Sequence, residues 1–298
     1  MWPEGRSRLV VCMDHLIWYE RPQLTKPVVI AAFAGWNDAA DAATMAVRHL
    51  ISTFDARRVA TIDPEPFYKF QSTRPHVRLV DDGKREIVWP GNELYVARTS
   101  FGDALFVLGI EPQLKWRTFC QQITDLAVEH DATMALTLGA LLADVHHRSN
   151  IDVIGSATDQ ELIDRFDLQR SRYEGPTGII GVLSDAFGKR GIPSVSLWAA
   201  TPAYAAQLSS PKAARSLVRR VAELAGAPIS DQQLSRAVAT YEQNVDSHVA
   251  SDDDLARFVS QLHRTDSPPE PPTPEPMDAD PDAFVAEVER FLRDQGGE

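Results

Sequence analysis

The run Val28-Val29-Ile30-Ala31-Ala32-Phe33-Ala34 and the turn Gly35-Trp36-Asn37-Asp38 that follows it decide the fold of this chain. Seven apolar residues without a polar interruption are typical of a strand that is covered on both faces. A stripe of Ala and larger aliphatic residues then extends from Ala39 to Leu50 at helical spacing. Asn37 or Asp38 is expected to cap that helix. The stretch therefore predicts a unit of strand, tight turn and helix.

The same alternation returns further along the chain. Apolar runs predict strands at residues 58–62, 104–109, 133–138, 152–155 and 194–199, and helical periodicity predicts helices at 114–130 and from the turn at 175–178 to Lys189. We also expect a hairpin formed by residues 86–89 and 94–98 around Pro90-Gly91-Asn92. Strands that alternate with helices of this length indicate an α/β fold, in which helices flank a mostly parallel sheet.

Beyond residue 210 the pattern becomes helical. We expect an α/β core domain at residues 1–210 and a helical segment packed on it at 211–265. Residues 266–282 are dominated by Pro and acidic residues, with no Lys or Arg, which is typical of an extended linker. Residues 283–298 are expected to form an amphipathic helix, whose apolar stripe consists of Phe284, Val288, Phe291 and Leu292. This stripe is a candidate for oligomer contacts or for docking on the body.

Composition argues against several classes of function. The formal net charge of -12 disfavours nucleic acid or an anionic membrane as the main partner, since both reward clustered Lys and Arg. No apolar run approaches the ~18 residues of a membrane span, and the N-terminal residues lack the apolar stretch of a secretory signal. Cys12 and Cys120 belong to no metal-ligand spacing. We therefore expect no metal, no cofactor and a cytoplasmic protein.

Three segments supply the polar residues expected at the carboxyl edge of the sheet, where open α/β sheets bind ligands. The first is the turn after Ala34, the second extends from Gly139 to the two adjacent histidines, and the third is the turn at residues 175–178. We predict that they form one surface cleft. Its candidate residues are Gly35, Trp36, Asn37, Asp38, Asp41, Gly139, Asp144, His146, Gly175, Pro176, Thr177 and Gly178.

Each of these groups has a structural alternative. Asp38 and Asp41 either form part of a metal site or cap a helix and interact with its dipole. The glycine turn either cradles an anion at a helix start or is a plain turn. Asp144 and His146 form either a dyad on extended chain or part of a solvated loop. Trp36 is either a packing residue or an anchor at an interface. Because no nucleophile elbow accompanies these groups, no residue is assigned as catalytic.

Six stretches, in order, resemble the bacterial branch of the proteasome assembly chaperone 2 family over most of residues 28–262. They are Phe33–Ala43, Ile62–Tyr68, Arg85–Pro90, Leu138–Val145, Tyr173–Ile179 and Gly191–Ala199. The resemblance implies a fold similar to nucleoside phosphorylases, with a helical segment after the sheet. It also implies an assembly or scaffold protein that forms oligomers, so we expect a homo-oligomer, most simply a trimer.

Two departures from the family pattern weaken the case for an enzyme. His146-His147-Arg148-Ser149-Asn150 stands where the family leads us to expect Pro-His-Thr-Arg-Pro, and Pro202-Ala203-Tyr204 stands where we expect Pro-His-Tyr. Ala203 cannot supply the base that a His at that place would supply. We therefore expect a non-catalytic assembly-chaperone-like or scaffold protein that binds an unidentified protein partner. The alternative is a phosphorylase- or hydrolase-like enzyme that acts on a small polar metabolite.

Overall fold

The computed structural model describes residues 15–80 and 83–262. The chain divides into two compact units. Among the described residues, the main body contains every helix and strand, and Arg172–Pro176 belongs to the second unit. The predicted linker and the predicted final helix with Phe284, Val288, Phe291 and Leu292 lie outside the described residues.

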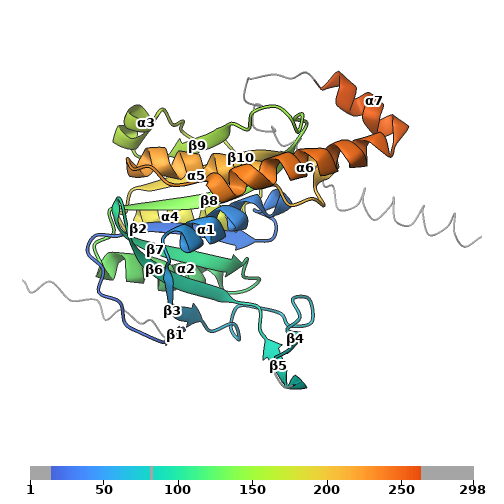
Figure 1. Cartoon of the computed structure of the whole chain (residues 1–298). Coiled ribbons are helices and arrows are strands. Elements are labelled where there is room, and N and C mark those ends of the chain that lie inside the picture. The colour runs from blue at the N-terminus through green and yellow to red at the C-terminus, as the bar shows by residue number, and fades with distance from the viewer. Residues whose placement is uncertain (1–14, 81–82, 263–298) are drawn as a thin grey trace, which may run out of the picture. The chain divides into compact units, whose positions relative to one another are not determined.

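An eight-stranded mixed sheet forms the centre of the main body (Figure 1). The order of its strands is β1 (Leu16–Trp18), β3 (Arg57–Ile62), β6 (Asn92–Thr99), β7 (Gly102–Ile110), β2 (Val28–Ala34), β8 (Met134–Ala143), β10 (Ser194–Pro202) and β9 (Val153–Ala157). Parallel pairing is confined to the central strands β7, β2, β8 and β10, and the outer pairs are antiparallel. The predicted α/β class with a helix-flanked sheet is confirmed, but the sheet is mixed rather than mostly parallel, because the strands outside the centre pair antiparallel.

Strand β2 lies in the middle of the sheet because both of its faces are apolar. Residues Val28 to Phe33 are all buried. Ile30 and Ala32 pack in one core, and Val29, Ala31 and Phe33 pack in the other. Successive side chains of a strand point to opposite faces, so this uninterrupted apolar run requires a covering layer on each side.

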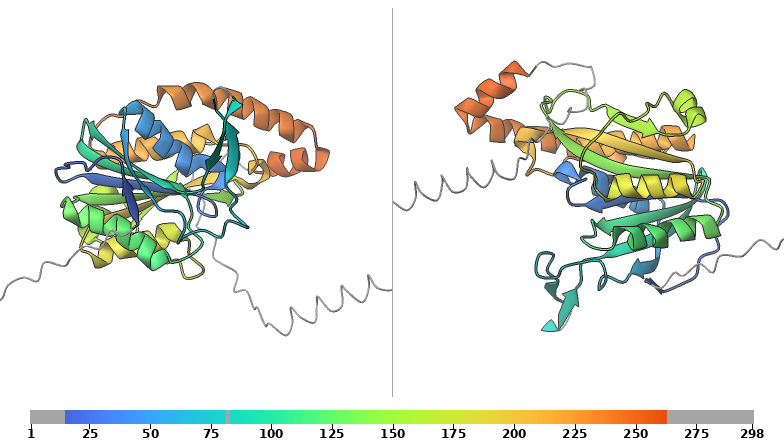
Figure 2. Two further views of the ribbon diagram at one scale, coloured as in Figure 1. Left: turned by 90° about the horizontal axis from the view of Figure 1, so that it is seen from below. Right: turned by 180° about the vertical axis from the view of Figure 1, so that it is seen from behind.

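Helices supply both covering layers. α1 (Ala42–Thr53) and α5 (Pro211–Ala225) cover one face of the sheet, and α2 (Trp116–Glu129) and α4 (Ile179–Lys189) cover the other (Figure 2). Cys120 is buried in the second core on α2, where burial raises the pKa of its thiol to about 12. It therefore behaves as the small apolar residue that the sequence predicts.

The remaining helices follow outer strands of the sheet or pack on α5 and on one another. α3 (Gln160–Phe166) follows β9, and the 3₁₀ turns η1 (Ala39–Asp41) and η3 (Ala203–Ala205) follow β2 and β10. α6 (Gln232–Ala250) packs on α5, and α7 (Asp253–Gln261) packs on α6. We call residues 232–261 the helical arm. Among the described residues, no helix has both the length and the apolar character that crossing a membrane requires.

The hairpin expected around Pro90-Gly91-Asn92 is wrong. β5 (Arg85–Val88) pairs with β4 (His76–Leu79) in a separate two-stranded sheet, and β6 pairs with β7 instead. Every residue of β4 and β5 is exposed. Neither strand therefore has the buried face from which a strand partner is normally read in a sequence.

Candidate functional site

The loop after β2 is locked to the neighbouring strand β8. Gly35 adopts a φ of 133°, which favours glycine, and its carbonyl accepts a hydrogen bond from Asp38 N at 3.1 Å. The carbonyl of Asn37 accepts a hydrogen bond from Ala140 N at 2.8 Å. The first and second predicted segments thus lie side by side at the carboxyl edge, as the topology of the sheet requires.

Glu111, the residue after β7, ties this loop to the start of α4. Its Oε1 accepts hydrogen bonds from Asn37 Nδ2 at 2.7 Å and from Ile179 N at 2.8 Å. The fit around Asn37, which is only 1% exposed, is close. A Cβ added at Gly178 would lie 2.2 Å from Asn37 Oδ1, so only glycine fits there. We call Asn37, Glu111 and Gly178 the loop cluster.

The loop cluster also places a negative charge at the N-terminus of α4. The first turn of a helix carries a partial positive charge and unpaired backbone N–H groups, which attract anions. Here the carboxylate of Glu111 acts as the anion, because it accepts a hydrogen bond from Ile179 N. The sequence prediction included Asn37 and Gly178 but missed Glu111. A charged residue directly after a buried strand is the signal that was available at that position.

Asp38 caps helix α1. Its Oδ1 accepts a hydrogen bond from Ala43 N at 2.6 Å, and its Oδ2 accepts one from Thr44 Oγ1 at 2.5 Å. Burial raises the pKa of Asp38, and these hydrogen bonds oppose the rise. Asp41 is exposed and accepts a hydrogen bond from Ser209 Oγ at 2.7 Å. The described residues contain no group of three or more His, Cys, Asp or Glu residues placed to hold a metal ion.

Other glycines and turns on the predicted list have packing roles. Gly139 is paired with Trp198 of β10, and a Cβ at Gly139 would lie 2.7 Å from the indole ring. Thr177 lies against Gly181, where an added Cβ would meet Thr177 Oγ1 at 2.1 Å. Within the second unit, Tyr173 Oη donates a hydrogen bond to the carbonyl of Pro176 at 2.7 Å, in the turn that contains Gly175.

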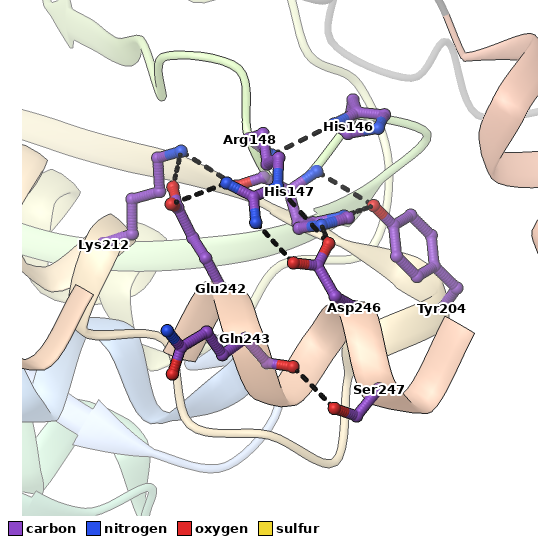
Figure 3. A network of polar contacts seen from close by, with 9 residues as sticks. All are labelled: His146, His147, Arg148, Tyr204, Lys212, Glu242, Gln243, Asp246 and Ser247. Carbon is purple, nitrogen blue, oxygen red and sulfur yellow. Dashed lines mark hydrogen bonds and ion pairs between the residues drawn. The ribbon is translucent and has the colours of Figure 1, made fainter. Parts of the chain in front are cut away.

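The second predicted segment leads to a different group of residues, drawn in Figure 3. The buried histidine is His147 rather than the predicted His146, which is partly exposed and stacks on the His147 ring at 4.6 Å between centroids. His147 contacts Tyr204 Oη through Nδ1 at 2.8 Å and Asp246 Oδ1 through Nε2 at 2.8 Å. We call His147, Tyr204 and Asp246 the histidine cluster. Asp144 is exposed.

The protons of the histidine cluster follow from its geometry. Tyr204 Oη accepts a hydrogen bond from the backbone N–H of His147 at 2.9 Å, so its own proton points to His147 Nδ1. His147 Nε2 then carries the ring proton and donates it to Asp246. Burial raises the pKa of Tyr204 to about 12, so its phenol stays protonated at neutral pH. Such a phenol is a structural hydrogen-bond donor and a poor nucleophile.

Ion pairs surround the histidine cluster and bind it to the helical arm. Arg148 pairs with Asp246 and Glu242 of α6, and its hydrogen bond, followed by that of His147, lowers the pKa of Asp246 to about 2. Lys212 Nζ of α5 donates hydrogen bonds to the carbonyl of His147 at 2.8 Å and to Glu242 Oε1 at 2.7 Å. These contacts fasten α6 to the end of β8. Their partners lie too far apart in sequence for any local motif to signal them.

Trp36, like Asp144, is a candidate residue that belongs to neither cluster. It lies between Gly35 and Asn37, and 66% of it is exposed. Two surface pockets, of about 360 Å³ and 280 Å³, lie elsewhere, one between α5 and α6 and one beside β9. The loop therefore presents a large aromatic side chain outward from a rigid backbone. The prediction of a shared cleft remains a prediction.

Comparison with known proteins adds the family. A model described as the PAC2 family matches residues 32–249. A PAC2 family protein from Streptomyces avermitilis is 40% identical, with a TM-score of 0.71 over 78% of this chain and 99% of its own. A Mycobacterium tuberculosis proteasome-assembly chaperone homologue is 39% identical, with a TM-score of 0.71 and the same coverage of both chains.

A further Mycobacterium tuberculosis protein, of unknown function, is 24% identical, with a TM-score of 0.75 over 98% of this chain and 95% of its own. At that identity the likeness shows the fold alone. No curated protein matches the chain at a significant level. The family model covers most of the main body, including the loop cluster and the histidine cluster. This chain belongs to the PAC2 family.

Proposed function

We propose that this chain is a non-catalytic assembly-chaperone-like or scaffold protein, which binds a protein partner through the loop Gly35–Asp38. The observation that carries the proposal is the exposed indole of Trp36 on a backbone fixed by Gly35 and by the loop cluster. Trp is enriched among the residues that dominate binding energy at protein interfaces. A rigid loop also lowers the conformational entropy lost when a partner binds.

The polar groups of the same edge support binding over chemistry. A phosphorylase-like or hydrolase-like reaction on a small polar metabolite needs groups that are available to the substrate. Glu111 instead binds Asn37 and the start of α4, and Asp38 caps α1. His147 is engaged by Tyr204 and Asp246. These side chains hold the scaffold that presents Trp36.

The relatives suggest the kind of partner. One solved structure 39% identical to this chain is described as a proteasome-assembly chaperone homologue. We therefore propose subunits of an oligomeric enzyme, first of all proteasome subunits, as the partner to be tested. We further propose that the protein acts in the cytoplasm, consistent with the buried free thiol of Cys120, and that it forms a homo-oligomer, a trimer.

Affinity capture tests this proposal. The tagged protein is used to capture partners from native lysate, which are identified by mass spectrometry and then measured with purified components, beginning with proteasome subunits. Trp36→Ala should weaken binding of the partner by at least ~20-fold, as expected for an interface hot spot. Tyr19→Ala, which removes a similarly exposed aromatic side chain after β1, is the matched control. Equal capture of the same partners by wild type and Trp36→Ala would overturn the proposal.

A further inference from the structure

The backbone directly after Asp38 is strained. Ala40 and Asp41 have φ values of 52° and 53°, and they are the only adjacent non-glycine residues with a positive φ among those that the structure describes. Aspartate tolerates this left-handed region, but the Cβ of alanine lies too close to the following carbonyl oxygen there. Such a conformation persists only where the surrounding structure holds it. We call residues 35–41 the Trp36 loop, and the contacts that hold its strained end therefore help to fix it.

The segment after β10 supplies these contacts. We call residues 203–210 the η3 turn. The carbonyl of Ala40 accepts a hydrogen bond from Ser210 N at 2.8 Å, and Asp41 Oδ2 accepts one from Ser209 Oγ at 2.7 Å. Ser210 is fully buried, and its side chain caps the start of α5. The η3 turn therefore holds the two strained residues against a fixed part of the main body.

The η3 turn also packs on the helical arm. Ala205 is buried together with Tyr241 and Val245 of α6. Tyr204 belongs to the histidine cluster, which includes a carboxylate of α6 (Figure 3). The ring of Tyr204 makes an edge contact with Phe258 of α7, with 6.4 Å between the ring centroids. The η3 turn thus contacts the helical arm as well as the Trp36 loop.

The helical arm is the part of this chain of contacts that opens most easily. The buried residues of α6 are Leu234, Tyr241 and Val245, and the only one of α7 is Val259. Segments with few buried apolar residues open locally at a lower free energy than the core does. Opening of the arm would remove the packing that keeps the η3 turn in place, and with it the support of the strained residues.

We propose that docking of the helical arm on the η3 turn holds Ala40 and Asp41 in the left-handed conformation, and that opening of the arm lets them relax. The inference rests on the proposed function of Trp36 and describes its regulation. The loop cluster fixes the loop at Asn37 with the arm docked or open, so the relaxation changes the end of the loop that leads into α1. A partner that binds the rigid loop then binds the docked form more tightly, and because coupling is reciprocal, it also tightens docking of the arm.

Hydrogen exchange of the full-length chain, followed by mass spectrometry, tests this coupling. Glycine adopts a positive φ without strain, so Ala40→Gly favours the docked form and should slow exchange in residues 232–261. The cost of the left-handed region for alanine corresponds to a decrease of at least ~5-fold in the exchange rate. Lys115→Gly is the matched control, because this exposed residue also has a positive φ, of 51°, and begins α2 on the other face of the sheet. It should leave exchange in the arm unchanged.

The reciprocal measurement begins at the arm. Val245→Ala shortens a buried side chain that packs with Ala205, and it should speed exchange in residues 40–44 by at least ~5-fold, because truncation of a buried side chain weakens packing. Val59→Ala makes the same change in the second core, on β3, and should leave exchange in residues 40–44 unchanged. Unchanged circular dichroism establishes that each variant is folded.

Two outcomes would overturn the coupling. Exchange in the arm of Ala40→Gly that equals or exceeds that of wild type would show that the arm opens without relaxation of Ala40. Faster exchange of the arm in Val245→Ala, with no change in residues 40–44, would show that the η3 turn keeps its place without the arm. Both measurements use the chain alone, so they are independent of partner capture through Trp36, and either proposal can fail while the other stands.

Discussion

The loop cluster and the histidine cluster lie at the same edge of the sheet but are built in different ways. In the loop cluster, Glu111 binds a backbone N–H and a buried amide, and the chain passes so close that Gly178 has no room for a Cβ. In the histidine cluster, side chains from η3, α6 and the loop after β8 meet, and the side chain of Asp246 is 42% exposed. The loop cluster is held by contacts to the backbone, whereas the histidine cluster is held by contacts between side chains, one of which is close to solvent.

This difference predicts how each region tolerates change. Close-packed buried contacts lose several kcal/mol when volume or hydrogen bonding is wrong. Ion pairs near solvent contribute little because water and salt screen them. The loop cluster should therefore set the stability of the edge, whereas the histidine cluster should mainly set the attachment of the helical arm. Substitutions in the two regions separate these roles.

The largest effect is expected in the loop cluster, for Gly178→Ala. The new methyl group would lie 2.2 Å from Asn37 Oδ1, so Asn37 or the start of α4 must move and the hydrogen bonds to Glu111 are disturbed. We expect the free energy of unfolding to fall by about 3 kcal/mol, at the upper end for overpacking. Urea unfolding monitored by circular dichroism measures it.

Gly188→Ala is the matched control in the same helix. Nothing lies within 4 Å of a Cβ added there, and alanine is the better helix former. This variant should equal or exceed the stability of the wild type, by up to ~1 kcal/mol. If both alanine variants had similar stabilities, the close approach of Asn37 to Gly178 would have no energetic importance.

In the histidine cluster, His147→Ala should have a smaller effect, about 2 kcal/mol. The substitution removes a buried ring, takes away the acceptor of the Tyr204 hydroxyl proton, and removes one of the hydrogen bonds to Asp246. His146→Ala, which removes the partly exposed neighbouring ring, should cost no more than ~1 kcal/mol. Thermal unfolding of both variants gives the comparison. A larger loss for His146 than for His147 would reverse the roles assigned to the two histidines.

The sequence predicts well the parts of this molecule whose signal is local. The uninterrupted apolar run of β2 and the amphipathic period of α2 identify their elements, since burial on one or both faces leaves a pattern in the chain. Asp38 is recognisable because an Asp just before a helical stripe is a preferred N-cap residue. β4 has no buried face and leaves no such pattern, so the sequence wrongly predicts that β5 pairs with β6.

The sequence does not predict the histidine cluster, because its residues lie far apart in the chain and leave no local pattern. His147 and Asp246 are 99 residues apart, and His147 and Tyr204 are 57 apart, so their meeting depends on the packed fold. The sequence offered two adjacent histidines and no physical basis for choosing the second. Glu111 reaches Asn37 across 74 residues, through the parallel register of β7 with β2. Contacts of this kind become visible only once the order of the strands is known.

Titration offers a further comparison between buried and exposed carboxylates. The pKa of Asp38 is raised by burial, whereas the hydrogen bonds of Arg148 and His147 lower that of Asp246 to about 2. A lowered folded-state pKa adds stability above the unfolded value of 3.8, and this contribution is lost as the pH falls toward 2. A raised pKa has the opposite sign, because ionisation of Asp38 lowers stability as the pH rises above 3.8.

Unfolding measured between pH 2 and pH 7 for wild type, Asp246→Asn and Asp38→Asn tests these signs. The advantage of wild type over Asp246→Asn should grow with pH to at most ~1 kcal/mol, the range of exposed ion pairs. The free energy of unfolding of wild type relative to Asp38→Asn should fall as the pH rises over the same interval. Slopes of the same sign for both variants would contradict the assignment of one carboxylate as buried and the other as paired near solvent.

The smallest effect is expected for Asp144→Ala, a residue that the sequence places in the candidate cleft. Asp144 is exposed in the bend after β8, outside both clusters, so its carboxylate is hydrated in the folded and the unfolded chain alike. A hydrated side chain adds little to folding, and we expect a change of no more than ~1 kcal/mol in the free energy of unfolding, centred near zero. Differential scanning calorimetry of Asp144→Ala and His147→Ala under the same conditions compares the two losses of stability. A loss as large as that of His147→Ala would mean that Asp144 supports the loop that carries the histidine cluster. Asp144 would then count as a member of that cluster rather than as a solvated neighbour.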